Sequence, residues 1–358
     1  MNDPRLKRVL QNLEKLNLEQ AIITSPISIR YLTGYDVEPF ERFLALVIST
    51  KREPVLFVNS LFPNAAPFAP HIVELTDTDE VIPTLLPYIA SDEVLGVDQN
   101  LLCKWFLPLQ DAHAAAGYQL ASSILDDARA VKLPEELDKM RAASRVNDEC
   151  MAWLMDHVRE GVTERELANG LLQQYKLHGA SGPSFSPIIS FGANAADPHH
   201  KPDDTRLVSG NCVLFDVGCV LDEYCSDMTR TAFFGEPSQE FIDAYNLVLK
   251  AQKAAENMAA PGVAFSELDK TARDIITAGG YGPNFTHRLG HFIGLQDHET
   301  GDVSATNTNR IVAGNCFSIE PGIYVEGRFG IRIEDLLITT DEVCEVINHY
   351  PKELKVFN

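Results

Sequence analysis

Two aspartates, Asp216 and Asp227, flank a short polar segment in residues 210–231, which read GNCVLFDVGCVLDEYCSDMTRT. If this segment folds back between Leu221 and Asp222, an antiparallel hairpin forms and Asp216 comes opposite Asp227. Directly opposed residues of such a hairpin have Cβ atoms roughly 5 Å apart. Two carboxylates held that close among apolar residues repel each other unless a cation lies between them. The hairpin therefore predicts a cation-binding site.

The same arrangement occurs a second time further along the chain. The motif LVSGNC at 207–212 is echoed by IVAGNC at 311–316. Upstream, GV followed by EL at 161–167 is repeated at 262–268. Each copy is expected to run helix, helix, hairpin. The repeat predicts a duplicated α+β domain whose two halves pack about a pseudo-twofold axis.

The repeat also supplies two further acids. Glu320 occupies the place of Asp216, and a turn centred on Gly327 brings Glu334 opposite Glu320. Together with Asp227 these residues form a group of four convergent carboxylates, which is unfavourable among apolar strands without compensation. Two divalent cations balance four negative charges, and a two-metal site activates water and binds a substrate oxygen. A purely structural acidic cluster is the alternative, and it predicts that no metal is bound.

Histidines near the second hairpin point to transition-metal chemistry. Residues 286–299 read THRLGHFIGLQDHE, and Gly290 and Gly294 would let the backbone around His291 approach the metal centre closely. His291 is therefore the predicted imidazole ligand, which favours manganese, iron or cobalt over calcium. His298, seven residues later, is expected to lie near the metals without binding them.

The elements that position these residues follow from apolar periodicity and turn residues. A helix is predicted from Asp3 onward, and strands are predicted at 21–24, 44–49 and 54–58. Residues 1–125 are expected to form a smaller α/β domain. Residues 126–132 are predicted to be a linker, and Pro134 begins a long helix of the second domain, 126–358.

Composition limits the function classes. The 358 residues carry a formal net charge of −21 and 45% of them are hydrophobic, which describes a globular acidic protein. Nucleic acid and anionic membranes require a cationic surface, so neither is an expected partner. The N-terminus lacks an apolar leader, and the seven cysteines include no CxxC pair. A cytoplasmic location is therefore expected.

Asp216, Asp227, His291, Glu320 and Glu334 match, in type and order, the five metal ligands of the pita-bread metallopeptidases, which include methionine aminopeptidase, aminopeptidase P and prolidase. The segments DEYCSDMTRT, HRLGHFIG and SIEPGIYVEGRFGIRIED resemble the family signature, and the resemblance covers roughly residues 130–358. The N-terminal domain is similar to that of prolidases and aminopeptidases P. The resemblance implies a pita-bread catalytic domain.

The resemblance also implies residue roles. Two divalent ions are expected, with manganese as the usual metal and cobalt or zinc as alternatives. Asp216 would chelate one metal, Asp227 and Glu334 would bridge both, and His291 and Glu320 would complete the other shell. Glu320 would in addition shuttle a proton from the metal-bridging water. His199 and His298 would contact the scissile carbonyl or its oxyanion, and His287 and Arg332 would line the substrate pocket.

Arg288 separates two related activities. A dipeptidase must sense a free carboxylate beside the scissile bond, and Arg288 could pair with it in a bidentate manner. The alternative is that Arg288 pairs with a local acid. In similar bacterial dipeptidases a loop equivalent to residues 34–42 reaches a neighbouring active site in a homodimer, which adds Glu38, Glu41 and Arg42 as substrate-binding candidates.

The sequence thus predicts hydrolysis of Xaa-Pro dipeptides by a prolidase. An aminopeptidase P-like enzyme that cleaves longer peptides is the first alternative. A non-catalytic relative that binds a peptide or protein is the second.

Overall fold

The computed structural model describes residues 3–62 and 64–358, and it divides into two compact units, Met1–Arg129 and Ala130–Asn358. The predicted boundary at 125/126 lies inside helix α5 (Ser123–Ala130), so most of the predicted linker 126–132 is helical. Ile124, Leu125 and Ala128 are buried at helical spacing, and this apolar face explains why the helix continues through the segment.

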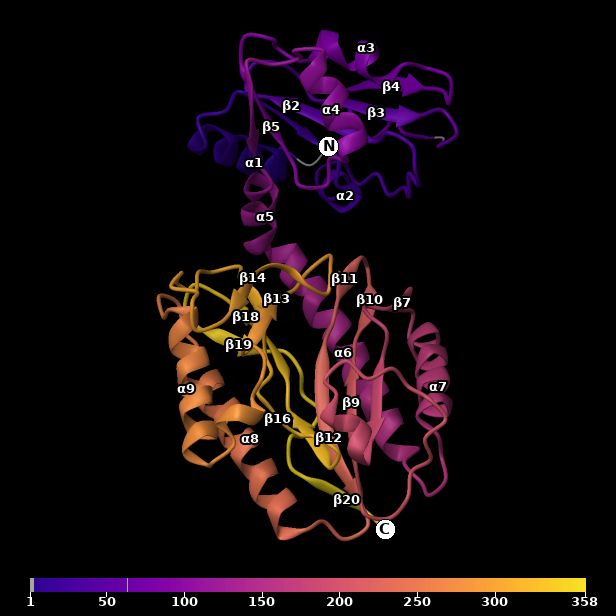
Figure 1. Cartoon of the computed structure of the whole chain (residues 1–358), viewed down its shortest axis with the longest axis vertical. Coiled ribbons are helices and arrows are strands. Elements are labelled where there is room, and N and C mark those ends of the chain that lie inside the picture. Colours follow the sequence, from indigo (N-terminus) through magenta and orange to yellow (C-terminus); the bar gives the residue numbers. More distant parts are fainter. Residues whose placement is uncertain (1–2, 63) are drawn as a thin grey trace. The chain divides into compact units, whose positions relative to one another are not determined.

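The N-terminal unit is built on a six-stranded mixed sheet of order β4-β3-β2-β1-β5-β6 (Figure 1). Its strands are β1 Gln20–Ile23, β2 Ala45–Ser49, β3 Val55–Asn59, β4 His71–Leu75, β5 Val94–Val97 and β6 Gly117–Leu120. Its other helices are α1 Asp3–Lys15, α2 Pro26–Thr33, α3 Val81–Leu85, the 3₁₀ helix η1 Leu86–Tyr88 and α4 Cys103–Asp111. The predicted first helix and the three predicted strands are confirmed.

The C-terminal unit contains two halves of similar construction. The first half comprises α6 Pro134–Asp156, α7 Glu164–Leu177, β7 Gly182–Pro183, β8 Ile188–Phe191, η2 Gly192–Ala196, β9 Asn211–Val217, β10 Cys219–Leu221, β11 Tyr224–Cys225 and β12 Met228–Phe234. The second comprises α8 Gln239–Met258, α9 Phe265–Ala278, η3 Gly282–Asn284, β13 Gly290–Phe292, β14 Glu299–Val303, β15 Cys316–Ile319, β16 Gly322–Val325, β17 Phe329–Arg332, β18 Asp335–Thr339, β19 Cys344–Val346 and β20 Lys355–Phe357. The order helix, helix, hairpin in each half is as predicted.

Equivalent hydrogen bonds in the two halves support the duplication. Thr163 and Arg206 form an isolated β-bridge in the first half, and Ala264 and Arg310 form its counterpart in the second. The helix that follows each bridge begins in the same way. The backbone N–H of Thr163 donates to Glu166 at 2.9 Å, and that of Ala264 donates to the side chain of Glu267 at 3.0 Å.

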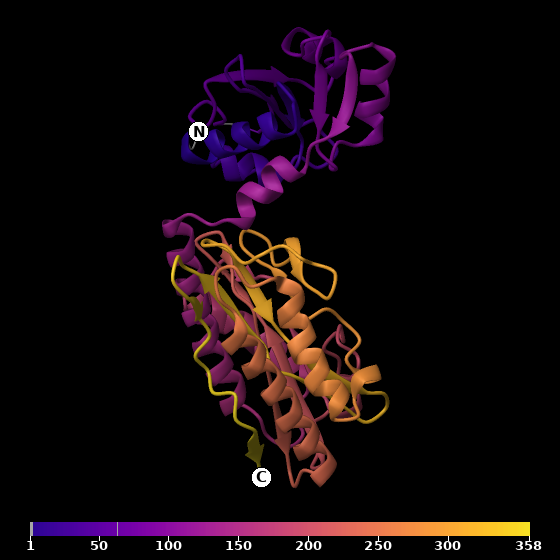
Figure 2. The same ribbon diagram turned by 90° about the vertical axis from the view of Figure 1, so that its left-hand side faces the viewer.

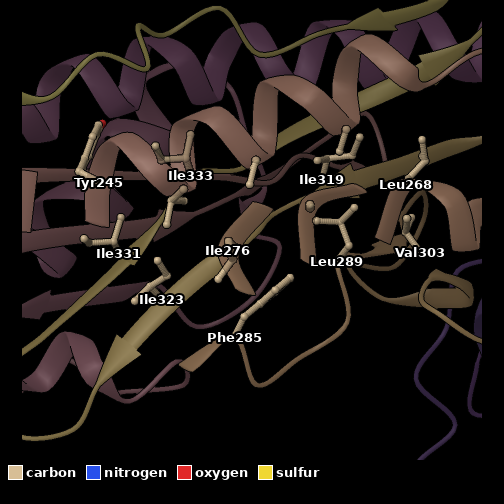
Figure 3. Close-up of a cluster of buried hydrophobic side chains, with 14 of the residues drawn as sticks. Tyr245, Leu268, Ile276, Phe285, Leu289, Val303, Ile319, Ile323, Ile331 and Ile333 are labelled. Atoms are coloured by element: carbon tan, nitrogen blue, oxygen red, sulfur yellow. The ribbon is translucent and has the colours of Figure 1, made fainter. Parts of the chain in front are cut away.

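Helices cover the strands of each half (Figures 1 and 2). In the second half, Leu268 and Ile276 of α9 belong to the same buried cluster as Ile319 and Ile331 of the strands (Figure 3). Close packing of such side chains leaves little freedom to the strands they hold. The core therefore gives a rigid base to the hairpins that carry the acidic residues.

The register of the first hairpin differs from the prediction. Asp216 on β9 pairs with Thr229 on β12, and not with Asp227. The turn is formed by Asp222 and Glu223, whose φ angles are 47° and 75°, so it lies one residue later than predicted. Two-residue hairpin turns favour positive φ at both positions, which aspartate tolerates. The partner of Asp216 thus shifts by two residues, from Asp227 to Thr229. Because side chains alternate with a period of two along a strand, Asp227 still points to the predicted face of the hairpin.

The predicted register of the second hairpin is confirmed. Ile319 pairs with Asp335 and Gly322 pairs with Arg332, which brings Glu320 opposite Glu334. Gly327 lies at the centre of the turn with a φ of 70°, a conformation that favours glycine.

Candidate metal centre

One cavity of about 640 Å³ in the C-terminal unit gathers most of the predicted site residues. Its walls include the five predicted metal ligands, together with His199, His287, Arg288, His298 and Arg332. Both hairpins and the segment between them thus contribute to a single site.

The two hairpins are joined directly at the acidic residues. The backbone N–H of Glu334 donates to the carbonyl oxygen of Thr229 at 3.1 Å, and the Thr229 hydroxyl donates to Glu334 Oε2 at 2.6 Å. Arg332 Nη2 donates to Asp216 Oδ2 at 2.5 Å. The atoms of Asp227, His291 and Glu334 that could bind a metal ion, one from each residue, all lie within 4.8 Å of one another. Tertiary contacts therefore bring carboxylates from both halves together.

His291 lies among these carboxylates. Its Nε2 is 3.5 Å from Asp227 Oδ2 and 3.5 Å from Glu320 Oε1. A Cβ atom on Gly290 would lie 2.0 Å from the carbonyl oxygen of Ser318, so only glycine permits this approach of β13 to β15. The backbone N–H of His291 then donates to the Ser318 hydroxyl at 3.0 Å. Gly290 thus permits close packing of the backbone beside His291 against Ser318 of β15, and the predicted close approach to the metals stays a prediction.

Burial makes the negative charges of this group costly. Burial, and then the neighbouring Glu334, raise the pKa of Asp227 well above its ordinary value. Burial, and then Glu320, do the same for the pKa of Glu334. Burial raises the pKa of Glu320 to about 8 and lowers that of His291 to about 3, so the imidazole is neutral at pH 7. A cation bound in the cavity would favour the ionised form of these carboxyl groups and so offset the energetic cost of burying their charges.

Unpartnered oxygens show that these residues fit divalent metal ions. Asp216 Oδ1, Asp227 Oδ1 and Glu334 Oε1 are buried and have no hydrogen-bond partner among the described residues. Buried carboxylate oxygens are normally hydrogen-bonded or bound to metal. Oxygen donors with one neutral imidazole suit manganese and similar metals. The donor set at this site therefore fits the metals that the sequence predicts.

The remaining histidines surround the metal-binding group. The His298 ring stacks on that of His291, with centroids 3.8 Å apart, and its Nδ1 lies 3.2 Å from Arg288 Nη2. His287 Nε2 lies 2.9 Å from the hydroxyl of Tyr324. Burial, and then Arg332, lower the pKa of His287 to about 4. His199 is exposed on the loop after η2. Several imidazoles can thus face a bound substrate.

Three further residues that the sequence did not single out support the site. The Tyr324 hydroxyl accepts a hydrogen bond from Arg332 Nη1 at 2.7 Å and is hydrogen-bonded to His287 Nε2 at 2.9 Å. The buried Glu164 accepts from His200 at 2.7 Å and thereby holds the loop that carries His199. Asp297 lines the cavity, and burial, followed by Asp216, raises its pKa to about 7. An acid directly before His298 was the signal that could have identified Asp297.

Glu38, Glu41 and Arg42 belong to the other unit and are not part of this cavity. Arg42 is paired with Asp77 through two bonds of 2.9 and 3.1 Å. Glu41 and Arg42 line a separate cavity of about 350 Å³. Their predicted contact with substrate stays a prediction.

Two further observations concern the cysteines and the helices. Cys212, Cys219 and Cys316 are buried, and burial raises their pKa values to about 11, 11 and 12. Within residues 3–62 and 64–358, no helix has the length and apolarity needed to cross a membrane.

Comparisons with known proteins agree with this geometry. The sequence model of metallopeptidase family M24 matches residues 138–341, and that of the creatinase/prolidase N-terminal domain matches residues 5–142. The chain is 39% identical to an uncharacterized peptidase of Staphylococcus aureus over 351 residues, which cover 97% of this chain and 99% of the relative.

Solved structures of similar proteins extend over nearly the whole chain. A prolidase from Thermococcus sibiricus is 30% identical, with a TM-score of 0.94 and coverage of 99% of both chains. Dipeptidase PepE from Mycobacterium ulcerans is 32% identical, with a TM-score of 0.91 and coverage of 99% of this chain and 97% of that one. The predicted pita-bread fold with a smaller N-terminal α/β domain is thereby confirmed, and the chain belongs to metallopeptidase family M24.

Proposed function

We propose that this chain is an Xaa-Pro dipeptidase that uses two divalent metal ions, with manganese as the physiological metal. The donor set of four carboxylates and one imidazole supports a dinuclear site. Similarity to prolidases over nearly the full length supports the dipeptide substrate. We further propose a cytoplasmic homodimer, which size-exclusion chromatography with light scattering tests directly.

The metal ligands have distinct proposed roles. Asp216 would hold one metal, Asp227 and Glu334 would be shared by both, and His291 and Glu320 would complete the ligand set of the other. The bound metals supply Lewis-acid activation of a water molecule and of the substrate carbonyl. Cobalt or zinc can substitute in the same donor set.

Protein side chains carry the proton transfers and orient the substrate. Glu320 accepts a hydrogen bond from the Ser318 hydroxyl at 3.2 Å, which fixes the carboxyl group that we assign as proton shuttle. His199 and His298 are assigned to the developing oxyanion, since both line the cavity and can donate from a ring nitrogen. His287 and Arg332 shape the pocket wall, where Arg332 also restrains Asp216.

The position of Arg288 carries the choice of a dipeptide substrate. Arg288 lines the same cavity as the metal-binding residues, and 38% of its side chain is exposed. Its Nη1 lies 3.9 Å from Asp302 Oδ2, a distance too long for a hydrogen bond. The guanidinium group thus keeps donors that can bind a substrate carboxylate in a bidentate manner.

The test compares dipeptides with and without a free carboxylate. We expect Arg288→Ala to raise KM for Xaa-Pro by roughly tenfold or more, since a charge-assisted hydrogen bond contributes about 1.5–3 kcal/mol. The same substitution should have little effect on an Xaa-Pro amide. Arg328→Ala is a matched control, because Arg328 is exposed and pairs with Glu240. Equal effects of Arg288→Ala on both substrates would refute the assignment.

A substrate panel separates the alternatives. Apo-enzyme prepared by chelation is assayed with added Mn, Co or Zn on Xaa-Pro and on Xaa-Pro-Xaa. Faster cleavage of the tripeptide would favour an aminopeptidase P-like enzyme. A non-catalytic binding protein would show no metal-dependent hydrolysis, and Asp227→Asn would leave its binding unchanged.

The substrate role of the N-terminal loop is tested separately. We propose that Glu38, Glu41 and Arg42 contact substrate from the protein's own subunit or from a partner. Replacing Glu38 and Glu41 by alanine should raise KM and leave metal content unchanged.

A further inference from the structure

Unpartnered carboxylate oxygens mark one residue beyond the predicted ligands. Among the described residues, five carboxyl side chains have a buried oxygen without a hydrogen-bond partner: Glu19, Asp216, Asp227, Asp297 and Glu334. Glu19 lies in the N-terminal unit, and its Oε2 forms an ion pair with Lys51. The remaining four all line the one cavity. Three of them are predicted metal ligands, and Asp297 is the fourth.

The backbone fixes Asp297 in this orientation. The N–H of Gly294 donates to the carbonyl oxygen of Gln296 at 3.0 Å, which closes a tight turn just before Asp297. On the other side, Glu299 accepts from the N–H of Leu295 at 3.0 Å and is paired with the buried Lys132. Hydrogen bonds therefore fix the backbone before Asp297 and the side chain of Glu299 after it, and this geometry directs the Asp297 carboxylate into the cavity.

Neighbouring groups leave an oxygen of Asp297 unsatisfied. Oδ1 has no hydrogen-bond partner among the described residues, whereas the side chain of Asp297 also contacts that of Asp227, and Oδ2 lies 3.6 Å from His298 Nε2. Only 21% of the side chain is exposed, so bulk water compensates little of the charge. A bound cation in the cavity explains this arrangement, as it does for Asp216, Asp227 and Glu334.

We propose that Asp297 is an additional carboxylate of the metal centre and strengthens the binding of at least one divalent ion. The inference rests on the metal-binding part of the proposed function and is independent of the substrate. Carboxylates that support a metal site from beside its ligands typically change affinity by about 10–100-fold.

The test measures metal binding directly. Full-length protein stripped of metal is titrated with Mn²⁺ by isothermal calorimetry, and stoichiometry is determined by elemental analysis. Asp297→Asn should weaken at least one binding step by roughly tenfold or more, whereas Asp297→Glu should retain most of the affinity. Asp302→Asn serves as the matched control, because it removes the same charge from a nearby residue. In the wild-type protein Asp302 accepts a hydrogen bond from the Ser304 hydroxyl.

The outcomes are distinct. Wild-type affinity in Asp297→Asn would overturn the inference, and so would an equal loss in Asp302→Asn. Melting temperatures of the metal-free proteins show whether the variant is folded, and Asp297→Ser replaces Asp297→Asn if it is not. Absence of Mn²⁺ binding by the wild-type protein would refute the proposed dinuclear function itself.

Discussion

A buried ion pair beside the metal centre allows a quantitative prediction of stability. Lys132 Nζ lies 3.0 Å from Glu299 Oε2, and the two side chains are 2% and 3% exposed. The backbone N–H of Lys132 also donates to the carbonyl oxygen of Gly314 at 2.8 Å. The pair therefore anchors the segment that presents Asp297 and His298 to the cavity.

Removing one partner should be strongly destabilising. Lys132→Met leaves the carboxylate of Glu299 buried without its cation, and breaking such a pair costs about 3–5 kcal/mol. For a domain of this size, 1 kcal/mol corresponds to roughly 2–4 °C in melting temperature. We therefore expect the melting temperature of the catalytic domain to fall by about 10 °C.

The pair is best tested by a set of variants. Denaturant and thermal unfolding are followed by circular dichroism for Lys132→Met, for Lys132→Met with Glu299→Gln, and for Lys270→Met. The double variant should recover a large part of the loss, because glutamine retains the acceptor for Leu295 without a buried charge. Lys270 and Asp274 form an exposed pair, so its loss should cost less than about 1 kcal/mol.

Two results would refute this reasoning. A Lys132→Met protein as stable as the wild type would show that the buried charge is compensated by other groups. A double variant as unstable as the single one would show that packing, and not an unpaired charge, causes the loss.

Three further predictions concern close packing, metal and pH. Gly290→Ala should abolish activity and destabilise the protein by more than about 2 kcal/mol, because the alanine Cβ would lie 2.0 Å from the Ser318 carbonyl oxygen. Gly117→Ala is the control in unfolding assays, since the nearest atom to its Cβ would be 3.7 Å away. Chelation should lower the melting temperature, and Mn²⁺ at about 100 times its dissociation constant should restore about 2.7 kcal/mol; an unchanged melting temperature would contradict metal binding. Burial, followed by Asp335, raises the pKa of Glu256 to about 7 from 4.5, so the folded state retains a proton that the unfolded state loses. The stability that the protonated Glu256 contributes to the folded state is fully present below pH 4.5 and is lost as the pH rises through about 7. Glu256→Gln should therefore gain stability relative to the wild type between pH 5 and pH 8, by at most a few kcal/mol in denaturant titrations; parallel pH profiles of the two proteins would contradict the prediction.

Local patterns in the sequence determined much of the fold. The first helix and the strands of the N-terminal unit follow from apolar periodicity, which depends on neighbouring residues alone. The repeated motifs identified the duplication, since each half needs the same turn glycines and helix starts. The second hairpin was placed correctly because Gly327 is a distinctive turn residue.

The tertiary structure decided what local patterns leave open. The first hairpin turns at Asp222 and Glu223. Aspartate tolerates positive φ but glutamate is not a typical turn residue, so the flanking strands decide the position of this turn. The pairing of Arg332 with Asp216 joins residues from different halves, which spacing cannot reveal.

The candidate site shows the same division. The sequence by itself supplied the acids and the histidine, because their types and repeated spacing are enough to predict metal chemistry. Only the packed structure placed Asp297 beside them, since its orientation depends on the turn at Gly294 and on the buried pair of Lys132 and Glu299. Residue type thus determined the chemistry of this protein, and long-range packing determined which side chains share the cavity.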